Sequence, residues 1–331
     1  MLKQLKRERW LSSGISVGII ALTVFSSLSH VAWHPYLELT AHFKVQYFLI
    51  SFIGLSLLLL FQAKYWLVIA LFCLGVQLVE ILPWYLPATW TTTSTANFRI
   101  LLSNVYVRNQ NPHKFLNLVA KEQPNLVIVQ EKTPFWLESL QPLHAQFPYF
   151  FQAPDDIAIF SQIPLEQPTI FGGVNQSSLA VTLTIDDRPV QVVTTHPPPP
   201  KPTLTASRNQ EFEWVANYIQ QQRGSIILIG DLNTTMWSPY YNQLKRKTGL
   251  VNGRQGFGIL PTWPAPTPYT STSSLLAFFK PFLWIPIDHC LVSPEIGVRS
   301  LRTGANIDSD HLPLVVDVFI PAQERLESGT S

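Results

Sequence analysis

The N-terminal part of the chain is dominated by long uncharged stretches, and these limit what the protein can fold into. No charged residue occurs between positions 10 and 37, and a second apolar run covers residues 45–63. A third run, residues 65–86, is interrupted only by Glu80. Because roughly 20 apolar residues are enough for a helix to cross a bilayer, we predict three membrane spans, near residues 13–33, 44–62 and 65–85.

The charges around these runs predict their orientation. Four positive residues precede the first run: Lys3, Lys6, Arg7 and Arg9. By the positive-inside rule the N-terminus is then cytoplasmic, and three crossings place the rest of the chain outside the cytoplasm. Glu80 is costly inside a bilayer unless it lies near the interface. If the third run does not cross, the rest of the chain is cytoplasmic instead.

A cleaved signal peptide is the alternative for the first run. Its apolar stretch exceeds the roughly 7–15 residues of such a core, and two further runs follow it. We therefore divide the chain into a basic N-terminus at 1–12, a membrane segment at 13–86, a Thr/Ser-rich linker at 87–96, a large domain at 97–320 and a disordered tail at 321–331.

The charge of the large domain excludes a strongly basic nucleic-acid-binding surface. Residues 97–331 hold seventeen Lys/Arg and eighteen Asp/Glu, so their net charge is close to zero. The chain has two cysteines, Cys73 and Cys290. Two cysteines rule out a disulfide framework and a cysteine-built zinc site.

Short apolar runs separated by Pro- and Gly-marked loops predict many strands and few helices in the large domain. Several runs, such as LVIV and IILI, are apolar at every position, which is typical of strands buried on both faces. We expect two packed sheets with helices outside them. The predicted strands are 98–107, 125–130, 157–160, 179–185, 190–195, 225–229, 287–292, 298–302 and 312–320, and the predicted helices are 112–122, 134–140, 207–222 and 239–248.

Polar residues stand at the ends of these strands. Each alone has an ordinary explanation: Asp231 as a turn former, Glu131 as a paired structural carboxylate, His196 as a loop residue. Together they form a set rich in carboxylates and imidazoles, which suits Mg²⁺ or Mn²⁺ better than zinc or copper. The groups are Asn104, Glu131, His196, Asp231 with Asn233, Asp288 with His289, and Asp310 with His311.

The order of these residues resembles the endonuclease/exonuclease/phosphatase superfamily, which includes deoxyribonuclease I, abasic-site endonucleases, inositol polyphosphate 5-phosphatases and neutral sphingomyelinases. The segments that carry the resemblance are Gln130-Glu131, GDLN at 230–233, IDH at 287–289 and SDH at 309–311. A closer similarity is to bacterial membrane-anchored members, through HPPPP at 196–200, PTWP at 261–264 and PIDH at 286–289. The resemblance implies an α/β fold, a four-layer sandwich of two mixed sheets flanked by helices.

The resemblance also implies roles for individual residues. Glu131 is the principal metal ligand, with Asn104 beside it and Asp310 supporting the ion or its waters. Asp231 and Asn233 position and deprotonate the attacking water, with Asp231 as the general base. His311, oriented by Asp288, binds a non-bridging phosphate oxygen or acts as acid/base, and His196 protonates the leaving group or stabilises the pentacovalent transition state.

Two further features bear on the substrate. Arg208 opens a helix after the His196 loop and is a candidate for binding phosphate, or else an ordinary helix-surface residue. The apolar segment 275–286, LLAFFKPFLWIP, directly precedes Asp288. Buried, it is core; exposed, it enters the bilayer, with Phe282 and Trp284 as interfacial anchors.

Three functions are consistent with these observations. The first is a membrane-anchored, Mg²⁺- or Mn²⁺-dependent phosphoesterase that acts on a lipid or small phosphodiester and contacts the bilayer through its N-terminal helices. The second is an extracytoplasmic nuclease, and the third a non-catalytic membrane sensor or scaffold. A nuclease needs a cationic groove, and a scaffold would not need the complete set. We therefore favour the first, in the cell membrane, and nothing in the sequence indicates an obligate protein partner.

Overall fold

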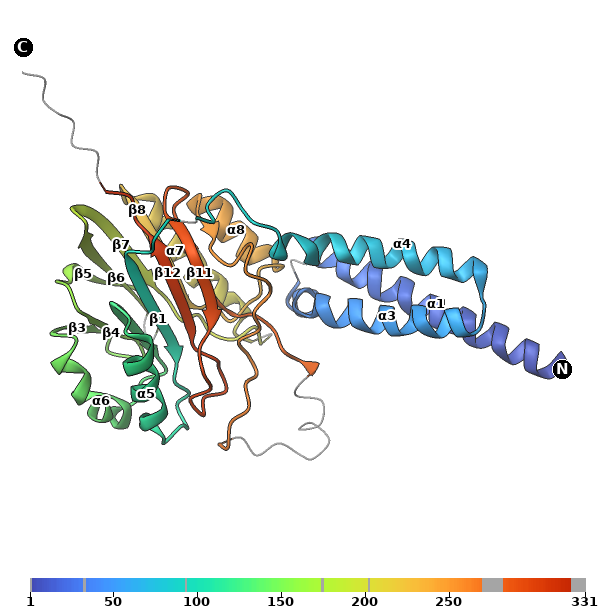
Figure 1. Ribbon diagram of the computed structural model, residues 1–331, viewed down its shortest axis with the longest axis horizontal. Helices are drawn as coiled ribbons and strands as arrows, with labels where there is room; N and C mark the ends of the chain where they lie inside the picture. Colours follow the sequence, from blue (N-terminus) through green and yellow to red (C-terminus); the bar gives the residue numbers. More distant parts are fainter. Residues whose placement is uncertain are drawn as a thin grey trace, which may run out of the picture.

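The computed structural model describes residues 2–31, 34–92, 94–173, 176–201, 203–269 and 282–322. A bundle of long helices comes first, and a sandwich of sheets and helices follows it (Figure 1). The predicted tail lies outside the described residues from 323 on, and so does the part of the apolar segment 275–286 that precedes 282.

The three long helices are α1 (Leu2–Leu28), α3 (Lys44–Leu60) and α4 (Lys64–Ile81). Within the described residues, three stretches are long and apolar enough to cross a membrane: Arg7–Leu28, Tyr36–Leu60 and Lys64–Tyr85. The three predicted spans therefore correspond to three helices, although the first helix begins earlier than expected and includes the basic N-terminal residues. Glu80 pairs with Lys44, so its charge is compensated.

Polar contacts connect the three helices. The side-chain amide of Gln77 on α4 donates to Thr23 Oγ1 on α1 at 2.8 Å and to Ser51 Oγ on α3 at 3.1 Å. All three side chains are buried. Hydrogen bonds of this kind stabilise helix association in a bilayer, where water is not available as an alternative partner.

The large domain contains two sheets, each of six strands within the described residues. The first has the order β11-β12-β1-β2-β4-β3, and the second has the order β5-β6-β7-β8-β10-β9. The strands of the first sheet are β1 (Phe98–Asn104), β2 (Leu126–Gln130), β3 (Tyr149–Gln152), β4 (Ala158–Ser161), β11 (Gly297–Thr303) and β12 (Leu314–Phe319). Those of the second are β5 (Glu166–Gly173), β6 (Gln176–Ile185), β7 (Arg188–Thr194), β8 (Ser225–Asp231), β9 (Val251–Asn252) and β10 (Asp288–Val292).

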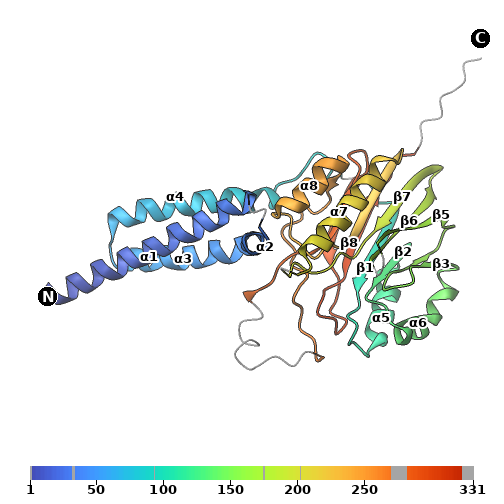
Figure 2. The ribbon, with the colours of Figure 1, turned by 180° about the vertical axis from the view of Figure 1, so that it is seen from behind.

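Helices cover the outer faces of both sheets. The helices α5 (Pro112–Glu122) and α6 (Pro134–Ser139) pack on the first sheet, through a cluster that includes Phe115 and Trp136. The helices α7 (Thr205–Gln220) and α8 (Pro239–Thr248) pack on the second, through Phe212 and Leu244. A third cluster fills the space between the sheets. The four-layer sandwich of two mixed sheets flanked by helices is thus confirmed (Figure 2).

The predicted helices 112–122 and 239–248 have the bounds that the structure shows, because both begin at a proline that suits a first turn. The strands β3, β5 and β9 were missed. Most residues of β5 are exposed or half-buried, since β5 lies at the edge of its sheet. An edge strand lacks the continuous apolar run by which the buried strands were recognised.

Hydrogen bonds bind the linker, residues 87–96, to the large domain. The backbone N–H of Val298 on β11 donates to Trp90 O at 2.8 Å, and Thr92 donates to Val298 O at 3.1 Å. The indole of Trp90 donates to Asn252 O at 3.0 Å. The segment predicted as an extended tether contains a turn, in which the Thr91 N–H donates to Ala88 O at 3.0 Å, and it is bound to the edge of the first sheet.

A short connection between α1 and α3 attaches the helical bundle to the sandwich. It consists of η1 (Ser29–Val31), α2 (Pro35–Glu38) and η2 (Leu39–Phe43). Glu38 at the end of α2 is fully buried, and its carboxylate contacts the Arg208 guanidinium of α7 at 2.5 Å. The same carboxylate accepts from Ser238 Oγ at 2.7 Å, at the start of α8. The buried carboxylate of Glu38 thus links the segment between α1 and α3 to α7 and α8, the helices that cover the second sheet.

Aromatic contacts reinforce this attachment at α4. Trp84, in η3 (Leu82–Tyr85), stacks edge-on against Trp237, with 6.4 Å between ring centres. Both indoles donate to the Glu80 carbonyl at 3.1 Å. The helical bundle and the sandwich therefore form a packed interface and not two parts joined by a flexible chain.

Breaking the Glu38–Arg208 pair tests this interface. The substitution Glu38→Ala leaves a buried guanidinium uncompensated, so we expect a loss of about 3–5 kcal/mol in the free energy of unfolding. The double substitution Glu38→Leu/Arg208→Met removes both charges and should restore most of that loss. The measurement is the thermal unfolding of the full chain in lipid nanodiscs. Lys247→Ala, which breaks a half-exposed ion pair with Glu213, is the control and should cost less than about 1 kcal/mol. Equal effects of Glu38→Ala and Lys247→Ala would contradict the assignment.

Candidate active site

The predicted polar residues meet at one edge of the sandwich. Asp288, the first residue of β10, lies directly opposite Asp231, the last residue of β8, because these strands are antiparallel. Asn104 at the end of β1 lies beside Gln130 at the end of the parallel strand β2. The ends of both sheets therefore contribute to a single group of side chains.

Two of these residues have an unusual backbone. Glu131 has a φ of 59° and Asn233 a φ of 49°, both in the left-handed region that residues other than glycine rarely adopt. Such conformations cost free energy and are concentrated at functional sites. Glu131 directly follows β2, and Asn233 follows β8 after Leu232, so both unusual backbones occur where a strand leads into the site.

Asp231 is at the centre of the group. Its Oδ2 lies 3.2 Å from Asn104 Nδ2, 3.4 Å from His196 Nε2 and 3.5 Å from His311 Nε2. Its Oδ1 accepts from the Asn233 backbone N–H at 2.8 Å. Burial alone would raise the pKa of Asp231, but the two imidazoles outweigh it and the pKa is lowered. The carboxylate is therefore ionised, as a proton acceptor must be.

A carboxylate lies behind each imidazole. Asp288 Oδ2 is 2.9 Å from His311 Nδ1, and Asp156 Oδ2 is 2.5 Å from His196 Nδ1. Burial lowers the pKa of both imidazoles, but the carboxylates around them raise it by more: to about 10 for His311 and well above the ordinary value for His196. Both imidazoles are thus held protonated, with Nε2 directed at Asp231.

Asp156 has a role that the sequence did not reveal. Asp156 was not among the residues that the sequence predicted for the site. Asp156 lies between β3 and β4, and β3 was missed, so the hairpin that brings Asp156 to His196 was not predicted. The available signal was an acidic pair directly before a buried strand.

Glu131 and Asn104 contact each other beside Asp231, and Asp310 lies near enough for the charges of Glu131 and Asp231 to affect it. Asn104 Nδ2 donates to Glu131 Oε1 at 2.9 Å, and the Val107 backbone N–H donates to Glu131 Oε2 at 2.8 Å. Trp263 Nε1 donates to Asp310 Oδ2 at 3.3 Å, but Asp310 Oδ1 is buried and has no hydrogen-bond partner among the described residues. Burial raises the pKa of Asp310, and the charge of Glu131 adds to this effect although His311 opposes it.

This group fits a divalent cation. It supplies carboxylate oxygens, which are ligands that Mg²⁺ and Mn²⁺ prefer, and a cation would compensate the unpaired oxygen of Asp310. A second group, Asp231, Asp288 and His311, has ligand atoms that lie within 4.8 Å of one another. In that group the imidazole already contacts both carboxylates.

Other residues hold the two sheets in register at this edge. Gln130 Nε2 donates to Thr195 O at 2.8 Å, and Gln130 Oε1 accepts from the Asp231 N–H at 2.8 Å, so one side chain bridges both sheets. A Cβ atom at Gly230 would lie 2.2 Å from Thr195 O. Only glycine therefore permits this close approach of β8 to β7.

Arg208 is not among the residues that the structure brings together. Its side chain is fully buried, contacts the carboxylate of Glu38 and lies 5.3 Å from the centre of the Tyr240 ring. The exposed helix surface that sequence analysis offered as the alternative is not its environment either. Its partner is 170 positions away in the membrane segment, which no local pattern reveals.

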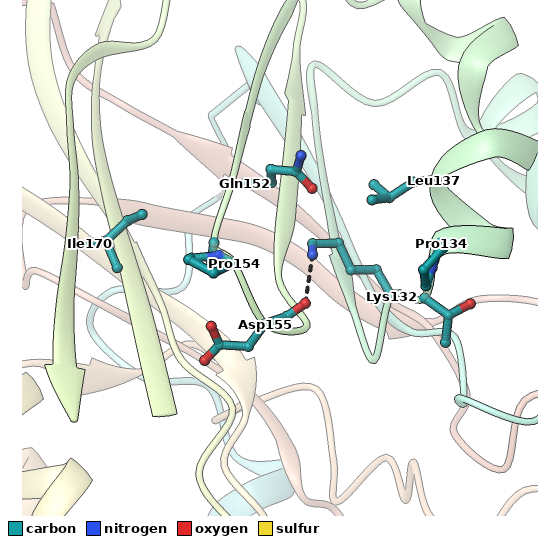
Figure 3. Close-up of a pocket in the computed structure, with 9 residues that line it drawn as sticks. Lys132, Pro134, Leu137, Gln152, Pro154, Asp155 and Ile170 are labelled. Carbon is teal, nitrogen blue, oxygen red and sulfur yellow. Dashed lines mark hydrogen bonds between the residues drawn. The ribbon is translucent and has the colours of Figure 1, made fainter. Parts of the chain in front are cut away.

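A depression borders the group on the side of Asp156. It has a volume of about 400 Å³, and its wall includes Lys132, Gln152 and Ile170 (Figure 3). Lys132 Nζ donates to the Asp155 carbonyl at 2.6 Å, as the dashed line shows. Because Lys132 follows Glu131 and Asp155 precedes Asp156, this depression adjoins the active-site edge. Its elements lie at the end of the sandwich away from the membrane helices (Figures 1 and 2).

Comparison with known proteins identifies the family. The model of the endonuclease/exonuclease/phosphatase family matches residues 101–311, which include all of the residues assigned above. The chain belongs to this family. Its members hydrolyse phosphoester bonds. No curated protein matches the chain in sequence.

Solved structures share the fold of the sandwich at low sequence identity. D. rerio TDP2 complexed with a single-strand DNA product is 16% identical, with a TM-score of 0.55, and covers 67% of this chain and 99% of its own. The human Nocturnin catalytic domain with bound sulfate is 18% identical, with a TM-score of 0.54, and covers 68% and 94%. An endonuclease/exonuclease/phosphatase from Beutenbergia cavernae is 18% identical, with a TM-score of 0.53, and covers 68% and 72%.

The Asp288–His311 contact predicts a change in pH dependence. Asp288 is the largest contribution that raises the pKa of His311 to about 10. In Asp288→Asn the pKa of His311 falls, so the imidazole loses its proton at a lower pH. If catalysis needs protonated His311, the alkaline limb of the pH–rate profile moves to lower pH. Glu213→Gln, at a half-exposed ion pair, is the control and should leave the limb in place. An unchanged limb in Asp288→Asn would show that His311 is not held protonated by Asp288.

Proposed function

We propose that the protein is a membrane-anchored, divalent-metal-dependent hydrolase that cleaves a phosphoester, most simply a phosphodiester, by means of an activated water. The observation that carries this proposal is the position of Asp231. Its carboxylate lies between two imidazoles and beside the Glu131 group. Phosphoester hydrolysis requires a base for water, a cation near the phosphate oxygens and a proton donor for the leaving group.

Asp231 acts as the base in this proposal. Its lowered pKa keeps it ionised. Asn233, whose backbone N–H donates to Asp231 and whose side-chain amide donates to Pro197 O at 2.9 Å, contacts the phosphate in this proposal. Glu131, Asn104 and Asp310 would hold the cation, which would polarise the phosphate and stabilise the charge that develops on its oxygens.

The two imidazoles act on the phosphate from protonated states. His311, held by Asp288, donates to a non-bridging phosphate oxygen. His196, held by Asp156, gives its Nε2 proton to the leaving oxygen. Asp231 has by then taken a proton from water, and it lies 3.4 Å from His196 Nε2. Transfer of that proton from Asp231 to His196 returns both residues to their starting states.

The helical bundle supports the proposal that the site lies on the extracytoplasmic side of the cell membrane. Arg9 and Lys64 line one recess at the end of the helical bundle far from the sandwich. Positive residues favour the cytoplasmic side. If the bundle crosses the bilayer with this end inside, the sandwich lies outside the cytoplasm and is anchored by the three helices.

An extracytoplasmic nuclease is the second candidate. It is favoured by the fold shared with TDP2, whose structure contains a single-strand DNA product. It is disfavoured by the near-zero net charge of residues 97–331, since nucleic-acid binding depends on cationic contacts to phosphates. The two candidates are distinguished by whether the purified protein prefers diesters with longer alkyl chains or diesters with a nucleoside.

Metal removal provides the first test. The full chain in nanodiscs should hydrolyse bis(4-nitrophenyl) phosphate with Mg²⁺ or Mn²⁺, and a chelator should abolish the reaction. Glu131→Gln should reduce kcat/KM by at least about a hundredfold, because a bound metal contributes several kcal/mol to catalysis. Glu138→Gln, at an exposed position on α6, is the matched control. Turnover that persists in chelator or in Glu131→Gln would contradict the proposal.

The leaving group provides the second test. 4-Nitrophenolate leaves without protonation, whereas an alkoxide does not. We therefore expect His196→Asn to slow hydrolysis of dimethyl phosphate by about 10²–10⁴-fold, and hydrolysis of methyl 4-nitrophenyl phosphate by much less. Asp156→Asn should show the same pattern to a smaller extent. Equal losses on both esters would assign His196 to another role.

A further inference from the structure

An apolar pocket lies between the membrane segment and the active site. Its volume is about 240 Å³, and its wall is almost entirely apolar. One side of the wall is formed by Leu39, His42 and Phe43, which belong to η2 between the first two membrane helices. The opposite side comes from the sandwich and includes Asn233 and Ile287.

The sandwich side of this pocket is continuous with the catalytic residues. Asn233 lines the pocket, and its backbone N–H donates a hydrogen bond to Asp231. Ile287 directly precedes Asp288. Trp263 also lines the pocket, and its indole donates to Asp310. A group that occupies the pocket is therefore adjacent to a phosphate held at the active-site edge.

The size and the wall of the pocket select a hydrocarbon occupant. An apolar cavity of about 150 Å³ stays free of water and holds a molecule of the size of benzene. The pocket here is larger, and water would find few polar partners in it. The exception is His42: its Nδ1 lies 3.1 Å from Thr235 Oγ1, whereas its buried Nε2 has no partner among the described residues.

The surroundings of the pocket point to the bilayer as the source of this hydrocarbon. Phe282, Leu283 and Trp284 directly precede Ile285 of the pocket wall and are 62%, 40% and 47% exposed. Gln46 on α3 donates to Trp284 O at 2.9 Å, so this exposed apolar segment lies beside a membrane helix. Aromatic residues at such a place favour the membrane–water interface.

We propose that this pocket binds the hydrocarbon chain of the phosphoester substrate, and that the substrate is an amphiphile taken from the membrane. The assignment rests on the proposed function and specifies its substrate class. It also makes Leu39 and Phe43, in the membrane segment, part of the substrate-binding site. The ester or hydroxyl group of such an amphiphile would supply the partner that His42 Nε2 lacks.

A chain-length series tests the proposal. The probes are 4-nitrophenyl phosphodiesters that carry a methyl, ethyl or butyl group, or a 5′-thymidyl group, with the full chain in nanodiscs. Burial of each methylene should raise kcat/KM by about fourfold, so the butyl ester should exceed the methyl ester by roughly 50-fold. Leu39→Trp fills the pocket and should bring this butyl-to-methyl ratio close to one. Leu37→Trp, at an exposed leucine outside the pocket, should retain the ratio.

Binding of butylphosphonate and methylphosphonate, measured by calorimetry with empty nanodiscs as the blank, gives a readout that does not need turnover. If no diester is hydrolysed, the proposed function fails, and tighter binding of butylphosphonate that is lost in Leu39→Trp would still support the pocket assignment. Hydrolysis without chain-length dependence, or the same dependence in Leu39→Trp, overturns it. A preference for the thymidyl ester over the butyl ester also overturns it, in favour of nucleic acid.

Discussion

One buried carboxylate, that of Asp231, organises the active site. It is contacted by His196 from the second sheet, by Asn104 from the first and by His311 from the loop before β12. These contacts exist only while the ends of the two sheets stay in register. A slip of one residue in β8 would turn Asp231 to the opposite face. The bridge through Gln130 and the close approach at Gly230 therefore serve the chemistry as well as the packing.

The membrane segment is part of this architecture and not an appended anchor. Glu38, in the segment between α1 and α3, is buried against Arg208 and the start of α8. Four residues later, His42 contacts Thr235, which belongs to the same loop as Asn233. A short helical connection thus supports the catalytic loop on one side and closes an apolar pocket on the other. If the helices cross a membrane as proposed, this arrangement places the proposed active site beside that membrane.

The sequence predicted the parts that depend on local pattern. Continuous apolar runs revealed the buried strands and the long helices, and GDLN and SDH marked strand ends whose side chains meet. The parts that it did not predict depend on pairs far apart in the chain. Asp156 required the hairpin of β3 and β4, and β3 has little buried surface. The buried environment of Arg208 depends on its contact with Glu38, which is far away in the sequence. The pocket depends on the position of η2 against the loops of the site.

The central claim is that the active site works on a substrate in the same membrane that holds the helices. Hexadecyl 4-nitrophenyl phosphate, anchored in vesicles, tests it directly. The purified full chain is reconstituted with Mg²⁺ either in the vesicles that contain this ester or in separate vesicles, and release of nitrophenolate is followed. The account predicts rapid release when protein and ester share a bilayer and little release when they do not. Equal rates in the two arrangements, or cleavage of soluble esters alone, would contradict it.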